Sequence, residues 1–204
     1  MKSKIVQQTI TLPNQDLVLL VPHCYEIKNK SELLFNIYKK LAELGDPHFQ
    51  YEYGCCFLYG RDVPQNTNTA RKWFQLSAEQ GYARSQYKMG IMHIRGEGGV
   101  NQDLKMAANW FQKAAEQNVP AAHANLASFY ARGGVVPKDR GLALKWFHRA
   151  AEQGNALAQF NLGRSYLHGG LGPKNVDLGV HWLKKAAEQG FEMAIEQLRV
   201  LNIN

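Results

Sequence analysis

The feature that most constrains this chain is a period of about 36 residues, carried by two independent landmarks. Tryptophan occurs four times, at intervals of 37, 36 and 36 residues: Trp73, Trp110, Trp146 and Trp182. A Glu-Gln pair follows every tryptophan at the same distance, with these glutamates: Glu79, Glu116, Glu152 and Glu188. Such self-similarity is typical of repeat arrays, in which each unit buries its apolar face by stacking on its neighbours.

Each period has the pattern of two helices joined by a loop that is rich in glycine or proline. The first helix carries a large apolar residue followed by glycine or alanine, at positions 54, 90, 127 and 163. The second helix has small residues before and after its tryptophan, at the spacing of a core-facing stripe. We predict that the small residues allow close backbone approach and that the tryptophan fills the space between the paired helices. Left-handed residues are expected to end the second helices: Gly81, Asn118, Gly154 and Gly190.

Both flanks of the repeats extend the same pattern. Residues 31–44 are periodic like a second helix, with Ile37 at the tryptophan position and Gly45 at the end. Residues 191–201 align with a first helix, but Arg199 replaces its small residue, so we predict a terminal cap there. Residues 1–30 allow two interpretations, either two short strands around a turn at 13–16 or an irregular cover over the first helix.

These residues resemble the Sel-1-like repeat family, a subclass of the tetratricopeptide-like α/α repeat proteins. The family pattern is A-x-x-x-L-G-x-x-Y-x-x-G, a glycine-rich loop, and D-x-x-x-A-x-x-W-x-x-x-A-A-E-Q-G, which residues 158–190 follow with Gly179 for the alanine. The resemblance covers residues 46–190, with Tyr53 for leucine and His93 for tyrosine as departures. It implies an all-α, right-handed α/α solenoid over residues 31–204. Its repeats are expected at 46–81, 82–118, 119–154 and 155–190, preceded by a degenerate half-repeat and followed by the cap.

Composition and motifs argue against several other classes. The net charge of +7 is spread along the chain without a basic block, so no nucleic-acid interface is expected. The cysteines are Cys24, Cys55 and Cys56, an odd count without a CxxC motif, which indicates reduced thiols. No apolar run is long enough for a signal peptide or a membrane span, so we expect a cytoplasmic protein.

Catalytic signatures are also missing from the sequence. The seven histidines are scattered, and neither a metalloprotease motif, a nucleophile elbow nor a phosphate-binding loop occurs. Some secreted members of the family bind or slowly hydrolyse β-lactams, but they carry a cysteine pair in each repeat, which this chain does not. We therefore expect no catalytic residue, no metal ligand and no cofactor.

The inner face of the first helices is the better candidate for function. By analogy with tetratricopeptide grooves, the positions one before, two after and six after the large apolar residue of each first helix face inward. Tyr59 stands at the last of these positions in the first repeat. The positions selected as a partner-binding groove combine cations, amides and aromatic rings: Arg84, Tyr87, Lys88, Arg95, Asn125, Arg132, Phe160, Asn161, Arg164 and His168. Arginine and lysine bind carboxylates through charge-assisted hydrogen bonds, and asparagine donates to a peptide backbone.

The sequence thus predicts a non-catalytic, monomeric interaction scaffold or adaptor, expected in a bacterium, that binds an acidic peptide segment or a C-terminal carboxylate of a partner protein in its concave groove. The resemblance leaves two alternatives open. One is a cognate immunity protein against a toxin, and the other is a secretion-system effector that is translocated and acts on host proteins.

Overall fold

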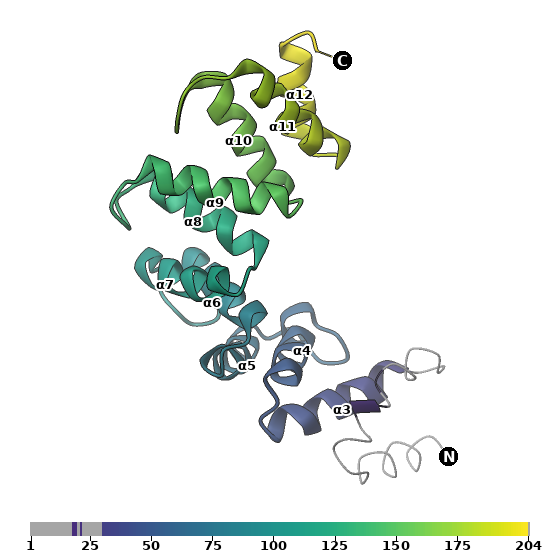
Figure 1. The fold of residues 1–204 in the computed structure, drawn as a ribbon. Coiled ribbons are helices and arrows are strands. Elements are labelled where there is room, and N and C mark those ends of the chain that lie inside the picture. The colour runs from purple at the N-terminus through teal and green to yellow at the C-terminus, as the bar shows by residue number, and fades with distance from the viewer. Residues whose placement is uncertain (1–17, 20, 22–29, 204) are drawn as a thin grey trace. The chain divides into compact units, whose positions relative to one another are not determined.

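The computed structural model describes residues 18, 19, 21 and 30–203, and residues 30–203 form consecutive helices joined by short connections (Figure 1). Their bounds are α3 Lys30–Glu43, α4 Pro47–Tyr59, α5 Thr67–Glu79, α6 Ala83–Arg95, α7 Leu104–Glu116, α8 Pro120–Arg132, α9 Arg140–Glu152, α10 Ala156–His168, α11 Val176–Glu188 and α12 Glu192–Val200. The predicted all-helical repeat fold, with helices packed in consecutive pairs, is confirmed. Both interpretations of residues 1–30 concern residues that are almost all outside the described part.

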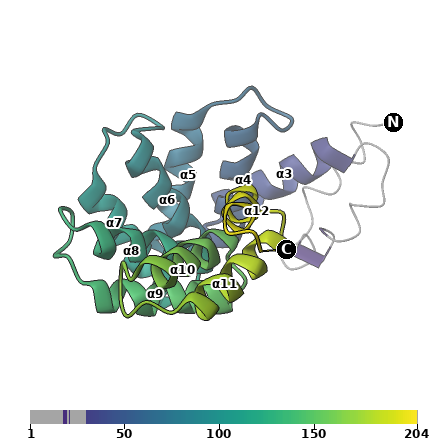
Figure 2. The ribbon, with the colours of Figure 1, turned by 90° about the horizontal axis from the view of Figure 1, so that it is seen from above.

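The helices belong to two compact units, Met1–Asp103 (unit 1) and Leu104–Asn204 (unit 2). Unit 1 contains α3 to α6, and its α4 and α5 form a closely packed pair. Unit 2 contains α7 to α12, and its pair α10 and α11 lies side by side in both ribbon views (Figure 1, Figure 2). The division falls in the loop of the second repeat.

Local signals at both ends set the length of the second helices. The N-cap side chains of α5, α9 and α11 accept a hydrogen bond from a backbone N–H of the first turn at 2.9, 2.8 and 3.0 Å: Asn66, Asp139 and Asn175. Such caps satisfy N–H groups that have no partner inside the helix. At the other end, the predicted left-handed residues have φ of 92°, 61°, 84° and 77°, which confirms them as helix stops: Gly81, Asn118, Gly154 and Gly190.

The tryptophan packs between the paired helices as predicted, since Trp73 lies on Tyr53 of α4 with the ring centroids 5.1 Å apart, but it is not the residue that contacts the small residue of the partner helix. A Cβ atom on Gly54 would lie 2.8 Å from the Phe74 ring, and one on Gly163 would lie 2.8 Å from Leu183. Phe74 and Leu183 each follow a tryptophan directly and are completely buried. Because successive helix residues point about 100° apart, the residue after the tryptophan faces the small residue of the partner helix.

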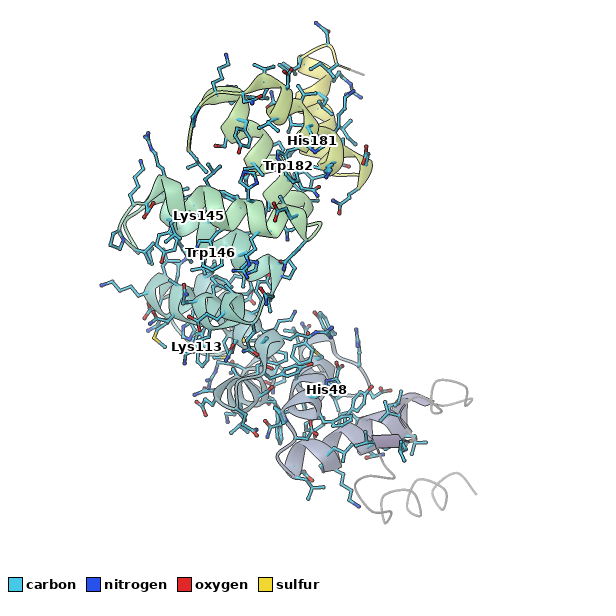
Figure 3. All side chains as sticks on the ribbon, viewed as in Figure 1. His48, Lys113, Lys145, Trp146, His181 and Trp182 are labelled. Carbon is cyan, nitrogen blue, oxygen red and sulfur yellow. The ribbon has the colours of Figure 1, made fainter. Side chains whose placement is uncertain are left out.

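The tryptophans instead pack beside these contacts. Trp182 belongs to a buried cluster with Phe147 of α9 and Ala127 of α8, which are residues of the preceding repeat. Figure 3 labels Trp146 and Trp182, which point into the packed helices of unit 2. Over each tryptophan ring of unit 2 lies the cation that follows it by three residues, at 4.6, 5.9 and 4.9 Å from the ring centroid: Lys113, Arg149 and Lys185.

A buried glutamine links successive helices, and the sequence analysis did not identify it. The Gln159 Nε2 donates to the backbone oxygen of Ala151 at 3.0 Å, and its Oε1 accepts from Gln189 Nε2 at 2.7 Å. The same two bonds occur in unit 1 at 3.3 and 2.8 Å: Gln50 with Ala42 and Gln80. The bonds to alanine supply partners for carbonyls near helix ends, and the bonds between glutamines give a structural reason for Gln80 and Gln189, which follow the landmark glutamates Glu79 and Glu188.

His123 replaces this glutamine in the third repeat and is completely buried. Its Nε2 lies 2.9 Å from the backbone oxygen of Ala115, and its Nδ1 lies 3.2 Å from Gln153 Oε1. A carbonyl oxygen only accepts, so Nε2 carries the hydrogen that this bond requires. The ring also stacks on Trp146 at 5.0 Å. His123 therefore has a structural role that maintains the packing of unit 2.

Candidate functional site

Helix α6 carries four of the residues predicted for the partner-binding groove. Arg84 and Arg95 are exposed, whereas Tyr87 and Lys88 are half-buried. Positions 84, 88 and 95 recur at helical spacing, so they share one face of α6. The structure brings Tyr87, Lys88 and Arg95 to the same cavity, and Arg84 does not line it.

This cavity, which we call the α4–α6 pocket, has a volume of about 500 Å³ and lies within unit 1. The end of α4 contributes one wall, the start of α5 and the loop before it contribute a second, and α6 with Glu97 contributes a third. Its lining residues are Leu58, Tyr59, Gln65, Thr67, Tyr87, Lys88, Ile91, Met92, Arg95 and Glu97. The volume is in the range of small-ligand and side-chain sites, about 300–1,000 Å³.

Tyr59 is the centre of the charged side of this pocket. Its ring is 54% exposed, although it stands on the last turn of a packed helix. Lys88 Nζ donates a hydrogen bond to the Tyr59 hydroxyl oxygen at 3.1 Å and lies 5.6 Å from the ring centroid. The guanidinium carbon of Arg61 lies over the same ring at 5.0 Å. Two cations therefore share one aromatic ring, which concentrates positive charge at the mouth of the pocket.

Glu97 is the carboxylate that lines the α4–α6 pocket, and it contacts Arg95. The distance between Glu97 Oε1 and Arg95 Nη1 is 3.6 Å, and the side chains are 42% and 63% exposed. An exposed pair of this kind contributes little to stability, because water solvates both charges and the side chains lose freedom when they pair. Arg95 can therefore exchange this contact for another carboxylate at low cost.

The other predicted groove residues lie in unit 2, on α8 and α10. Arg132, Arg164 and His168 are exposed, and Asn125 and Asn161 are half-buried. The amide of Asn125 donates to the backbone oxygen of Ala121 at 2.8 Å. This amide is therefore already used within its own helix.

Phe160 does not offer the aromatic platform that the sequence analysis predicted. Only 6% of its surface is exposed, and it packs in a buried cluster with Leu183 and Leu198. The guanidinium carbon of Arg164 lies 5.6 Å from the centroid of the Phe160 ring, so the ring makes a cation–π contact with Arg164. The spacing rule placed position 160 near the face but could not show that the aromatic ring points into the core.

The two described cysteines are free, buried thiols. Burial raises the pKa of Cys56 to about 11, and burial also raises the pKa of Cys55. A thiol with a raised pKa stays protonated at neutral pH and is a poor nucleophile. Cys24 lies outside the described residues.

His93 is the described histidine with a perturbed pKa. It is half-buried on α6, its Nδ1 is buried without a hydrogen-bond partner, and burial lowers its pKa below the usual value of about 6.5. The unfolded chain therefore binds a proton at this side chain at a higher pH than the folded chain does. As the pH falls below about 6.5, this difference removes stability.

We accordingly expect His93→Phe to reduce the acid sensitivity of the fold. Phenylalanine occupies the equivalent position in the first repeat, as Phe57. The melting temperatures of wild type and variant, compared from pH 8 to pH 5, should diverge in favour of the variant toward pH 5. Parallel curves over this range would show that His93 does not contribute to acid destabilisation.

Two further findings concern metal ions and membranes. Over the described residues, no three side chains of His, Cys, Asp or Glu gather to hold a metal ion. Within the same part of the chain, no helix is long and apolar enough to cross a membrane.

Sequence reasoning missed three residues that line the pocket, and also Arg61, which lies on the Tyr59 ring beside it. Arg61, Gln65 and Thr67 come from the α4–α5 loop and the first turn of α5, and Glu97 comes from the loop after α6. The position rule covered only first helices, so it found Tyr59 but none of these four. The sequence does show a polar loop between the two helices of the first repeat. Such a loop could have pointed to these residues, since functional side chains often lie on loops.

Solved structures of similar fold include two bacterial proteins that are more than a third identical to this chain. A protective antigen of uropathogenic Escherichia coli displaying an SLR fold is 35% identical, with a TM-score of 0.75 over 80% of this chain and 35% of that chain. A Sel1 repeat protein from Oxalobacter formigenes is 36% identical, with a TM-score of 0.74 over 84% of this chain and 49% of that chain. The chain thus spans less than half of the length of either protein.

An F-box protein of Arabidopsis thaliana is also similar, with 36% identity over 67 residues, which are 33% of this chain and 18% of that protein. The model of the Sel1 repeat matches four consecutive segments, residues 47–82, 83–119, 120–155 and 156–191. These segments begin one residue later than the predicted repeats and together cover more than two thirds of the chain. The helix pairs, their spacing and the Trp and Glu-Gln landmarks all fall inside them, and the chain therefore belongs to the Sel1 repeat family.

Proposed function

We propose that this chain is a non-catalytic interaction module that binds an acidic segment of a partner protein through exposed cations on its first helices. The observation that supports this proposal is the set of exposed cations on these helices that lack a carboxylate partner. The ion pairs among the described residues include Lys39–Glu43, Arg95–Glu97 and Arg199–Glu196. Arg132 and Arg164 are exposed and take part in none of them.

The charge of these side chains favours carboxylates over neutral ligands. Arginine presents a planar set of N–H donors that matches a carboxylate, and it stays charged at any physiological pH. Arg164 is supported by the ring of Phe160, so part of its freedom is already lost before binding. Such pre-ordering lowers the entropic cost of binding.

Capture of a partner from the source cell tests this function. We expect wild-type protein to retain a partner that the triple variant Arg95→Glu, Arg132→Glu and Arg164→Glu loses, because reversed charges repel an acidic segment. The control is Lys72→Glu, Lys105→Glu and Lys145→Glu, which changes the net charge equally on exposed second-helix positions. A partner that both variants retain would contradict the proposed role of the first-helix cations.

The same capture separates the more specific roles by what is bound. A toxin as the lost partner supports an immunity protein, and a host protein supports an effector. A protein of the same cell that is not a toxin supports the role of an adaptor.

A further inference from the structure

We propose that the α4–α6 pocket recognises a short extended peptide in which an acidic residue stands beside a large apolar residue. This inference rests on the proposed function and names the chemistry of one of its contacts. The pocket combines a charged rim, formed by Tyr59, Lys88 and Arg95, with an apolar floor, and Arg61 lies on the Tyr59 ring outside the lining. All of these residues belong to unit 1.

The rim is arranged to donate hydrogen bonds to an anion. Tyr59 already accepts a hydrogen bond from Lys88 at 3.1 Å, so the Tyr59 O–H remains available as a donor. The Lys88 ammonium has two further N–H groups, and the Arg61 guanidinium lies on the same ring. The Tyr59 hydroxyl and the Lys88 ammonium thus offer neighbouring donors, with the Arg61 guanidinium on the same ring, and this set of donors suits a carboxylate.

Acidic groups also lie near this rim. Glu97 pairs with Arg95 at 3.6 Å in an exposed contact, which an incoming carboxylate can replace. Burial is the main cause that raises the pKa of the Cys55 thiol, and the nearby Glu52 raises this pKa further. Lys88 and Arg61 lower it. Asp62 and Glu52 likewise act on the neighbouring Cys56 thiol against Arg61. The hydrogen-bond donors of the rim, and not an excess of positive charge, therefore favour a carboxylate.

The floor of the pocket explains why a free anion is a poorer fit than a peptide. Leu58, Ile91 and Met92 line it, and Met92 is 2% exposed. A methionine side chain is flexible and polarizable, and it adapts to apolar groups of different shape. A ligand that places an apolar side chain on this floor removes both surfaces from water, which a small carboxylate cannot do.

The combination is specific to this place in the chain. Two repeats later the positions of Tyr59 and Lys88 hold Arg132 and Asn161, which provide neither the ring nor the ammonium. In unit 2 these two residues are exposed and half-buried, respectively. The pocket is therefore a distinct contact, and the other repeats do not copy it.

Fluorescence anisotropy with labelled seven-residue peptides on the full chain tests the inference. The probes share a Gly-Ser background and differ at two central residues, which are Glu-Leu, Gln-Leu or Glu-Ser. We expect Glu-Leu to bind at least tenfold more tightly than either other peptide, because only it supplies both groups. Lys88→Gln and Tyr59→Phe should each weaken Glu-Leu binding by about tenfold, since each removes one donor at the rim.

Matched controls make each result decisive. Lys72→Gln changes the same charge on an exposed position of α5 and should leave peptide binding unchanged. Equal binding of Glu-Leu and Gln-Leu, or full binding by Lys88→Gln, would overturn the pocket assignment. Competition by free glutamate at the same concentration as the peptide would also overturn it. The two proposals can fail separately. If a partner is captured through Arg132 and Arg164 but the three peptides bind equally, the proposed function stands and only the pocket assignment is overturned.

Discussion

Phe74→Ala should lower the free energy of unfolding of unit 1 by about 3–5 kcal/mol, and by more than Trp73→Ala does. Phe74 is completely buried against Gly54, so truncation leaves a cavity between α4 and α5 that the backbone cannot close. Trp73 is half-buried and packs on Tyr53 with the ring centroids 5.1 Å apart. Part of the tryptophan surface is therefore already in contact with water in the folded state.

Urea denaturation followed by far-UV circular dichroism measures both variants, and hydrogen exchange locates the loss in α4 and α5. Trp73 and Phe74 are consecutive residues of α5, so both variants change the same turn of the same helix. An equal or larger loss for Trp73→Ala would contradict the assignment of Phe74 as the residue that fills the pair.

Gly163→Ala should destabilise unit 2 by about 1–2 kcal/mol, although alanine is the better helix former. A Cβ atom at this position would lie 2.9 Å from the backbone oxygen of Gly179 and 2.8 Å from the Cγ atom of Leu183. A backbone oxygen cannot rotate away, so α10 and α11 must separate. That separation weakens the packing of the whole pair and outweighs the gain in helix propensity.

Gly170→Ala is the matched control, since a Cβ atom there meets no atom within 4 Å and the backbone is not left-handed. It changes the same residue type in the same unit and should leave the denaturation midpoint unchanged. If both variants behaved alike, the close approach of α10 and α11 would not be a source of stability.

The candidate site was predicted in part. The helical spacing of the first helices correctly placed Lys88 and Arg95 on one face, because the position of a side chain around a helix follows from its number. The same rule failed for Phe160, whose ring turns into the core with Leu183 and Leu198. It also missed Arg61 and Gln65, because the loop of seven residues between α4 and α5 has no periodicity from which its side chains can be placed.

The sequence by itself determined the family, the number of repeats, the helix pairs and the residues that end the second helices. These are local properties, since a cap, a left-handed glycine and a 36-residue period each depend on a few neighbouring residues or on their count. Tertiary structure decided which apolar residue fills each pair. Trp182 and Leu183 are both large and apolar, and only the rotation of α11 against α10 turns one toward Gly163 and the other toward the preceding repeat. The α4–α6 pocket arose in the same way, because it forms only when the ends of two helices and a loop meet in space.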